Sequence, residues 1–370
     1  HMRKIILEKK RKDDYPLLVM KLDWKNLPRP IIALSPMADM TDSAFCRTVR
    51  SISPMSPIGP IGLIVFREMV SAEAVVRRNN KTLAMTDIHE DERPIVQQLF
   101  GSDPDTMAEA ARIIEEQHHP EGFDVNMGCP VYKIVHNFNG AALMREPELA
   151  TQIIKKMKKA STVPISIKIR TGWDDPRECF AFAKVIEEAG ADMITIHGRT
   201  KTQGYSGQSD WNLIGELKKT LSIPVLANGD IHTAPLSLKA LDQTQTDGIL
   251  IARGALGNPW IFSQITDALA EKAPTQITLE ERIRVIKQHL AFHLEQYGVQ
   301  GVVTFRKHLS WYFRGVPGAR PFKERLHTAG TLEAVHEILN EILLDGLLHE
   351  ALSDRDAVNP VAAERVFMTK

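Results

Sequence analysis

Eight short runs rich in Ile, Val and Leu alternate with amphipathic segments between residues 31 and 255 of this chain. The runs cover residues 31–37, 62–69, 94–101, 123–129, 164–171, 193–200, 224–230 and 248–255. Such continuous apolar character is typical of parallel strands buried on both faces. Between them, segment 103–117 opens with acids, segment 146–160 ends in lysines and segment 176–190 closes on Gly190, as helices favour. Strands and helices alternate in this way in both a (β/α)8 barrel and a doubly wound sheet. Eight strands, with no G-x-G-x-x-G after the first, favour the barrel.

The strand pattern stops after residue 270, and amphipathic helical patterns follow at 279–298 and 331–348, with segment 302–316 between them. We therefore expect an α/β fold, with a (β/α)8 TIM barrel over 28–270 followed by a smaller all-α helical domain over 271–370. Residues 1–27 are expected to form an extension that packs on the body, and His1 and Met2 look like a cloning scar. The weak periodicity of 353–370 is typical of a partly mobile terminus.

Charge and cysteine content limit the classes of function. The formal net charge is zero, whereas general nucleic-acid binders tend to be basic, so any nucleic-acid contact must rest on a local patch. There is no apolar run long enough for a membrane span and no apolar stretch typical of a secretory signal. The three cysteines are far apart and form no C-x-x-C motif. We expect a cytoplasmic protein without disulfides or a metal site.

Polar residues interrupt the apolar runs at nearly every predicted carboxyl end. Because barrel enzymes carry their active sites at these ends, the recurrence predicts one shared pocket. The residues at these ends are Pro36, Met37, Ala38, Gln98, Asn126, Cys129, Lys168, Arg170, His197, Arg199, Asn228, Gly229, Asp230, Ala252, Arg253 and Gly254.

The last two strand ends predict a phosphate site. Gly229 and Gly254 allow an anion to approach the backbone closely, and Arg253 adds a fixed positive charge. The alternative is that both glycines only end strands. Lys168 lies inside an apolar run, which predicts an anionic ligand as its partner rather than a surface position, because a buried unpaired ammonium is costly. His197 is expected to contact the ligand, although it could be a satisfied core histidine.

Cys129 lies between Gly128 and Pro130 in the loop after the fourth run. A thiol at the mouth of a pocket can act as a nucleophile or as a proton donor. A nucleophile needs a nearby base, and His136 has no demonstrable relation to Cys129, so the residues alone leave both roles open. Cys46 and Cys179 are expected to be small core residues.

Basic residues crowd one segment of the expected helical domain, which contains Glu324 as its single acid. They are Arg306, Lys307, Arg314, Arg320, Lys323 and Arg325, and Trp311, Tyr312 and Phe313 lie among them. A solvated face beside core aromatics would give this pattern, and so would a patch that binds RNA phosphates. We favour the RNA patch, because it suits local phosphate contact on a neutral protein.

The chain resembles the tRNA-dihydrouridine synthases over about residues 28–345, most closely their bacterial B-type branch. The matching stretches are "SPMADMTDSAF", "QLFGSDP", "VNMGCPVYKI", "NGAALM", "IKIRTGW", "TIHGRTKTQGYSG", "IPVLANGDI", "GNPWIF" and "RKHLSWYFRGVPGARPFK". The resemblance implies an enzyme that uses flavin mononucleotide (FMN) to reduce specific uridines of tRNA to 5,6-dihydrouridine. NADPH would reduce the flavin, hydride would pass to C6 of uracil, and Cys129 would protonate C5.

The resemblance also implies roles for the pocket residues. The isoalloxazine would contact Pro36, Met37, Ala38 and Gln98, and the ribityl phosphate would contact Asn228, Gly229, Asp230, Ala252 and Arg253. Lys168 would support negative charge on the reduced ring, and His197 would border the flavin. The uracil would contact Asn126, Arg170 and Tyr205. The basic segment would then bind tRNA through Arg314, Arg320 and Lys323.

Two features depart from the family pattern. Cys46 separates Phe45 from Arg47, whereas in the family a Phe is commonly followed directly by an Arg. The extension before residue 28 is also longer than expected. Two other functions remain open, a flavin barrel that acts on a free small molecule and a non-catalytic RNA-binding flavoprotein. We expect a monomer without a protein partner.

Overall fold

The computed structural model describes residues 22–53, 62–131, 134, 138–314 and 319–345. Eight parallel strands close into a barrel in sequence order, and β8 pairs with β1. The strands are β1 (Ile31–Leu34), β2 (Ile64–Ser71), β3 (Ile95–Phe100), β4 (Gly122–Met127), β5 (Ile165–Arg170), β6 (Met193–His197), β7 (Val225–Asn228) and β8 (Gly248–Ile251). The predicted barrel is confirmed, as is each of its strands. Most of the predicted runs continue past the carboxyl end of the strand into the loop that follows.

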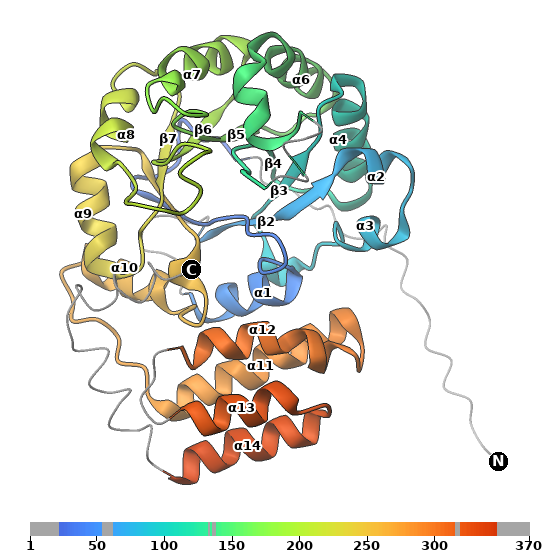
Figure 1. Cartoon of the computed structure of the whole chain (residues 1–370), viewed down its shortest axis with the longest axis vertical. Helices are drawn as coiled ribbons and strands as arrows, with labels where there is room; N and C mark the ends of the chain where they lie inside the picture. Colours follow the sequence, from blue (N-terminus) through green and yellow to red (C-terminus); the bar gives the residue numbers. More distant parts are fainter. Residues whose placement is uncertain (1–21, 54–61, 132–133, 135–137, 315–318, 346–370) are drawn as a thin grey trace.

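Helices surround the barrel, as Figure 1 shows. They are α1 (Ser43–Ile52), α2 (Ala72–Val76), α3 (Asn80–Ala84), α4 (Pro104–His118), α6 (Pro147–Ala160), α7 (Glu178–Ala189), α8 (Trp211–Lys218), α9 (Ala234–Thr244) and α10 (Ile261–Leu269). Short 3-10 turns cover Glu90–Glu92, Gly140–Arg145 and Arg253–Ala255. The expected helix ends have a local cause: the Asp103 side chain accepts a hydrogen bond from Thr106 N at the start of α4, and Gly190 ends α7 with a φ of 101°.

Residues 22–27 close the amino end of the barrel. Leu22, Trp24 and Leu27 are buried in one apolar cluster with the first residues of several strands, including Ile31 and Ile64. The Trp24 ring lies 6.1 Å from the Phe66 ring inside the barrel. This part of the extension therefore packs on the body as expected, while residues 1–21 lie outside the described chain.

Four further helices form a separate group with its own apolar core. They are α11 (Leu279–Tyr297), α12 (Gly301–Tyr312), α13 (Arg320–Thr328) and α14 (Leu332–Asp345). Helices α11, α12 and α14 match predicted patterns, whereas α13 was not predicted as a helix of its own. None of the described helices is both long and apolar enough to cross a membrane.

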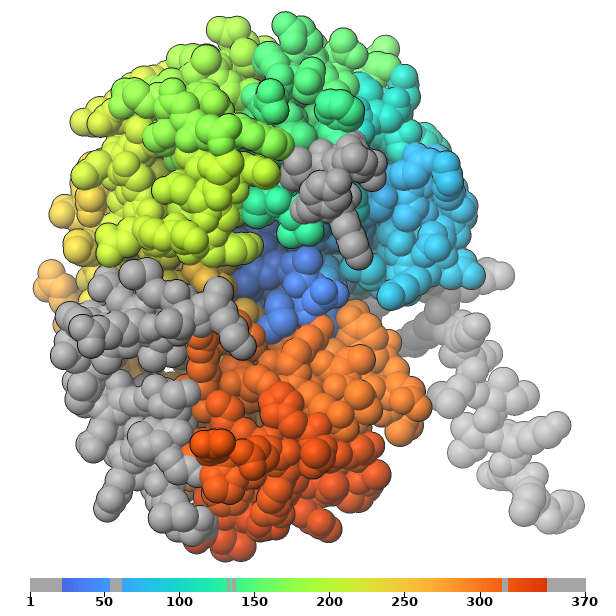
Figure 2. All heavy atoms as spheres, in the orientation of Figure 1, coloured from blue at the N-terminus to red at the C-terminus, as the bar shows by residue number. Residues whose placement is uncertain are grey.

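The helical group lies against α1 and the loop that precedes it. In Figure 2 its orange atoms lie directly beside the dark-blue atoms of the first barrel elements. Arg47 of α1 forms an ion pair of 2.6 Å with Glu295 of α11. Lys307 of α12 donates a hydrogen bond to the backbone oxygen of Asp39, in the loop after β1. The helical group thus supports a loop at the carboxyl face of the barrel.

Candidate active site

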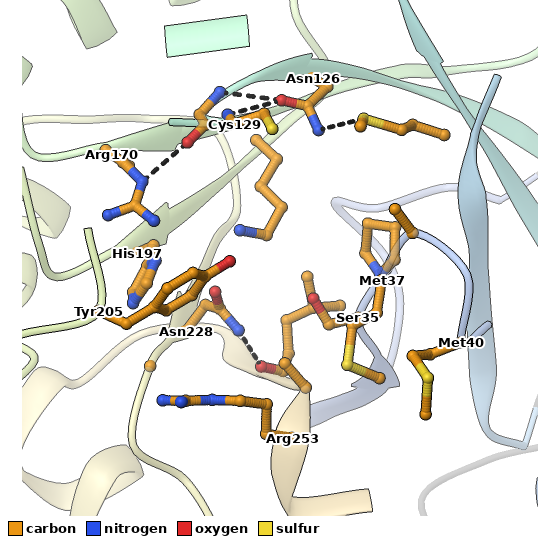
Figure 3. Close-up of a pocket in the computed structure, with 18 of the residues that line it drawn as sticks. Ser35, Met37, Met40, Asn126, Cys129, Arg170, His197, Tyr205, Asn228 and Arg253 are labelled. Carbon is orange, nitrogen blue, oxygen red and sulfur yellow. Dashed lines mark hydrogen bonds between the residues drawn. The ribbon is translucent and has the colours of Figure 1, made fainter. Parts of the chain in front are cut away.

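A cavity of about 330 Å³ opens at the carboxyl ends of the strands. Its volume falls within the range of small-molecule sites. It is lined by Cys129 and by every barrel residue that the family resemblance assigns to flavin or uracil. Arg199 and Gly254, which also lie at strand ends, do not line it. Figure 3 shows Cys129 and Asn126 on one side of this cavity and Arg253 on the other.

The backbone of Cys129 is fixed by hydrogen bonds. The Asn126 side-chain oxygen accepts from Gly128 N at 3.1 Å and from Cys129 N at 2.9 Å. Cys129 O accepts from Ala141 N at 3.0 Å. A β-carbon added at Gly140, whose φ is +59°, would meet Cys129 O at 2.8 Å, so this close approach requires glycine. These contacts hold the thiol at the cavity wall, and its Sγ makes no hydrogen bond within the described residues. His136 lies outside them.

The Asn126 carboxamide forms its hydrogen bonds with other groups of the protein. Its Nδ2 donates to Gln98 Oε1 at 3.0 Å and lies 3.3 Å from Met69 Sδ, while its oxygen accepts the two backbone N–H groups described above. A carboxamide has two donors and two acceptor sites, so its capacity is filled. The structure therefore favours a positioning role for Asn126 on the Cys129 turn over the uracil contact that the resemblance implies.

A buried acid lies behind the amide pair. Asp124 accepts from Gln98 Nε2 at 2.6 Å and from Ser166 Oγ at 2.7 Å. Burial raises the pKa of Asp124 to about 7, although both hydrogen bonds and the Lys168 charge act to lower it. Sequence reasoning missed Asp124. The available signal was an acid in the middle of an apolar strand, the same signal that identified Lys168.

Lys168 lines the cavity without a hydrogen bond or ion pair to any part of the chain that the structure describes. Burial lowers the pKa of its ammonium to about 8, Arg170 lowers it further, and Asp124 and Cys129 oppose the shift. Lys168 is only half-buried, since the cavity exposes part of its side chain, but a cation that is largely removed from water and has no partner is still unfavourable. The position therefore suits an anionic ligand group, as the sequence predicts.

Arg170 connects the loops that carry Cys129 and Tyr205. Its Nε donates to Gly128 O at 2.8 Å, and its Nη1 donates to Thr200 O at 2.9 Å and Gly204 O at 2.7 Å. The Tyr205 ring is 56% exposed and lies 5.5 Å from the Arg170 guanidinium and 5.2 Å from that of Arg253. Arg170 is thus held by backbone carbonyls, whereas the Tyr205 side chain is largely exposed to solvent.

His197 is a neutral donor on the cavity wall. Its Nε2 lies 3.2 Å from Arg199 Nη1, and a guanidinium can only donate, so Nε2 accepts and the proton is on Nδ1. Burial lowers the pKa of His197 well below its usual value, and the charges of Arg170 and Lys168 add to the shift.

The loop after β7 presents unpaired backbone donors to the cavity. The N–H groups of Gly229 and Asp230 have no hydrogen-bond partner among the described residues, and both residues line the cavity. The Asp230 carboxylate instead binds Arg199 at 2.8 Å and lies 3.8 Å from Arg253. The backbone of Asp230, rather than its side chain, is therefore suited to an anion. Asn228 acts behind this loop, since its Nδ2 donates to Leu250 O at 2.6 Å.

The two glycines of the predicted phosphate site have different surroundings. A β-carbon at Gly229, whose φ is +111°, would lie 2.5 Å from Ser209 Oγ and 2.7 Å from His197 Cδ2. A β-carbon at Gly254 would meet Ile231 O and the His232 backbone. Gly254 therefore allows the loops after β7 and β8 to pack together, and only Gly229 lines the cavity.

The predicted tRNA-contact residues lie outside the cavity lining. Arg314 stacks on Trp311 at 4.8 Å. Burial lowers the pKa of Arg253, and the charges of Arg199 and Arg314 act in the same direction. The Arg320 side chain is 91% exposed and pairs with Glu324 at 3.2 Å. Lys323 is half-buried on the same helix, α13.

Comparison with known proteins gives a consistent match. A family model described as dihydrouridine synthase matches residues 32–346. A tRNA-dihydrouridine synthase B from Pasteurella multocida is 38% identical over 322 residues, covering 85% of this chain and 94% of that protein. A probable tRNA-dihydrouridine synthase 1 from Synechocystis is 36% identical, covering 84% and 85% respectively. A probable tRNA-dihydrouridine synthase from Mycobacterium tuberculosis is 35% identical, covering 91% and 87%. The chain therefore belongs to the dihydrouridine synthase family.

Proposed function

We propose that this protein reduces specific uridines in tRNA to 5,6-dihydrouridine, with FMN as its cofactor and NADPH as the reductant of the flavin. The observation that carries the proposal is one cavity that brings together the Lys168 ammonium, the Cys129 thiol and the backbone N–H groups of Gly229 and Asp230, none of which has a hydrogen-bond partner within the residues that the structure describes. The names of the relatives, which are tRNA-dihydrouridine synthases, agree with this chemistry.

The donor set fits FMN. The N–H groups of Gly229 and Asp230, with the Arg253 guanidinium, provide the backbone and cationic donors that a phosphate needs. Met37 and Met40 give the cavity a polarisable apolar wall for a flat ring. Lys168 and the Nδ1–H of His197 supply a cation and a neutral donor for ring heteroatoms that gain negative charge on reduction.

When bound and reduced, FMN would supply the hydride that C6 of uracil accepts. Cys129 would give its Sγ proton to C5, so that two new C–H bonds replace the C5–C6 π bond. The thiolate would then recover a proton from solvent. Positioned acid catalysis of this kind is commonly worth about 10²–10⁴ in rate. The fixed backbone of Cys129 keeps the donor at one place on the cavity wall.

A uridine must leave its stack in folded tRNA to enter the cavity, at a cost of a few kcal/mol. We propose that Tyr205 contacts the extruded base, because its exposed ring stands between two guanidinium groups. Arg170 would act through the loops that it holds, and Asn126 through the Cys129 turn.

The test compares three substrates for the FMN-loaded protein and NADPH: unmodified tRNA, uridine monophosphate and free uridine. We expect dihydrouridine in tRNA and little product from the small molecules. Turnover of free uridine at the rate seen for tRNA would favour a small-molecule flavin enzyme. If the protein binds tRNA but its reduced flavin is not reoxidised by tRNA in a single turnover, the result would favour a non-catalytic RNA-binding flavoprotein. A colourless protein that takes up no FMN would overturn the proposal.

A further inference from the structure

A buried polar cluster lies where the helical group meets the barrel, away from the cavity lining. It consists of Asp42, His289, His293 and His308. Asp42 precedes α1, the first two histidines lie on α11, and the third lies on α12. The relative exposure is 0% for Asp42, His289 and His293 and 2% for His308. Three imidazoles and a carboxylate therefore meet without access to solvent.

The ligand atoms of the cluster converge. One atom each from Asp42, His289 and His308 lie within 4.8 Å of one another. His293 Nδ1 lies 3.4 Å from Asp42 Oδ2, without the geometry of a hydrogen bond. His289 and His293 are four residues apart on one helix, so their side chains share a face.

Each of the three rings has a nitrogen without a hydrogen bond among the described residues. His289 Nδ1 lies 3.1 Å from Tyr312 Oη, and His293 Nε2 lies 2.8 Å from Thr304 Oγ1. In contrast, His289 Nε2, His293 Nδ1 and His308 Nε2 have no hydrogen-bond partner among the described residues. Unsatisfied buried polar atoms are rare in native proteins. His289 Nε2 and His308 Nε2, beside a His293 Nδ1 that faces Asp42 at 3.4 Å, therefore indicate a ligand that the chain itself does not supply.

The geometry points to a structural zinc site with one nitrogen each of His289 and His308 and an Asp42 carboxylate oxygen as converging ligands. His293 Nδ1, which lies 3.4 Å from Asp42 Oδ2 but outside this group of three, would be the fourth ligand after its ring moves toward the other two histidines. Imidazole and carboxylate suit Zn²⁺, and four closed protein ligands are typical of its structural sites. Zinc–ligand bonds of about 2.0–2.2 Å place tetrahedral ligands about 3.4 Å apart. The His293–Asp42 separation already has this value, and the ligand atoms of Asp42, His289 and His308 lie within 4.8 Å of one another. His293 needs a larger shift, because it does not lie within that distance of all three.

The surrounding hydrogen bonds support metal ligation. A histidine that binds a metal usually donates its other ring N–H to a neighbour, as His289 can to Tyr312 and His293 to Thr304. Asp42 is oriented in the same way, since it accepts from Phe45 N at 2.9 Å and from Tyr297 Oη at 3.2 Å.

The position of the site gives the metal a structural consequence. Asp42 ends the loop that carries Met37 and Ala38 into the cavity, and it caps α1. A zinc ion held by Asp42 and by two helices of the helical group would fix that group to this loop. The site is independent of the flavin chemistry, because none of its ligands lines the cavity.

The first experiment measures metal in the untagged full chain, purified without chelator, by mass spectrometry. We expect about one zinc ion per chain. Dialysis against a strong chelator should lower Tm, and zinc at about 100 times its Kd should restore it, a shift of roughly 3–8 °C. His289→Gln and His308→Gln should each lose the zinc. The matched control is His327→Gln on α13, an exposed histidine that bonds Ser310, and it should keep the metal.

Zinc below about a tenth of an equivalent, together with a Tm that does not respond to added zinc, would overturn the site. The same holds if His289→Gln and His308→Gln fold and retain zinc as the control does. If those variants do not fold, the metal content and the zinc response of the parent protein decide. A Tm that responds to pH but not to zinc would show that protonation of the histidines, rather than a metal ion, stabilises the cluster, and it would also overturn the proposal.

Discussion

Cys129 has a fixed backbone and a thiol that makes no hydrogen bond to any described residue, so its chemical role can be separated from its structural one. Cys129→Ala should bind FMN and be reduced by NADPH as the parent is, because the turn is held by Asn126 and Ala141 through backbone groups. Dihydrouridine formation should fall by about 10²–10⁴-fold with the loss of the positioned acid. Single-turnover reoxidation of the reduced flavin by tRNA measures the effect.

Cys179→Ala is the matched control for this prediction, because Cys179 is buried in α7 and its thiol donates to Pro176 O at 3.3 Å. It should keep near-parental turnover. If Cys129→Ala also turned over tRNA at the parental rate, the proton would come from another group. The burial of Cys46 and Cys179 confirms the expectation that both are core residues.

The raised pKa of Asp124 predicts how the folding stability depends on pH. Its folded pKa of about 7 lies above its ordinary value of 3.8, so the folded state holds the proton more tightly than the unfolded chain. Stability from this group is complete below about pH 4 and is lost as pH rises through about 7. Asp124→Asn keeps the shape and can still bond Gln98 and Ser166. Its Tm should therefore fall less than the parent's between about pH 5 and about pH 8.

The exposed Asp242→Asn on α9 is the control for charge removal alone, and its Tm should follow the parent's at every pH. If Asp124→Asn also ran parallel to the parent from acid to alkaline pH, Asp124 would titrate at its ordinary pKa. The raised pKa would then be wrong.

The sequence predicts which residues line the cavity, but it does not predict which hydrogen bonds their side chains make. Cys129, Lys168 and Gly229 could be found because a thiol, a cation and a glycine at strand ends are visible in one dimension. The saturation of the Asn126 carboxamide could not be found, because its partners come from three different segments. The proposed zinc site departs from the expected metal-free protein. That expectation considered cysteine spacing and overlooked the H-x-x-x-H pair formed by His289 and His293.

At the scale of elements, the loop after β7 is the part of the barrel most sensitive to an added methyl group. Gly229→Ala would be strained at a φ of +111° and would push against Ser209 and His197. Because this loop presents the N–H groups of Gly229 and Asp230, which no described residue accepts, FMN affinity should fall by about tenfold or more. Fluorescence titration of the apoprotein with FMN measures the loss.

Gly190→Ala is a close control, because Gly190 has a φ of +101° at the end of α7 and nothing lies within 4 Å of the added carbon. It should cost stability of the order of 1 kcal/mol without changing FMN affinity. An equal loss of FMN affinity in both variants would mean that general destabilisation, rather than the phosphate loop, caused the effect.

The strands could be predicted because each is buried on both faces and is therefore apolar almost throughout. Their carboxyl ends could not be placed exactly, because the residues that turn into the cavity, such as Ala252 and Arg253, continue the same pattern in sequence. Helix α13 was missed for a physical reason. It buries only Leu326 fully, so it lacks the wide apolar stripe that marks α11.

At the scale of the whole molecule, the basic segment of the helical group divides into two kinds of residue. Arg306 donates to the backbone oxygen of Ala329, and Arg325 forms an ion pair with Glu341 of α14, so both hold helices together. Lys307 joins the helical group to the loop after β1. The patch is therefore smaller than the sequence suggests. Arg320, whose side chain is 91% exposed, and Lys323 both lie on α13, and together with Arg314 they are the residues that the sequence predicts to contact tRNA.

Replacement of Arg314, Arg320 and Lys323 with alanine should weaken tRNA binding and flatten its salt dependence, because each lost phosphate contact removes about 0.7–1 unit of slope. The flavin spectrum and reduction by NADPH should not change, since those depend on the strand ends.

The control removes the same charge from the barrel's outer helices by replacing the exposed Lys155, Lys159 and Lys219, and it should bind tRNA as the parent does. A salt titration of tRNA binding compares the three proteins. If the first variant matched the parent at every salt concentration, tRNA would bind elsewhere, and the basic residues Lys9, Lys10, Arg11 and Lys12 of the extension would be the next to replace.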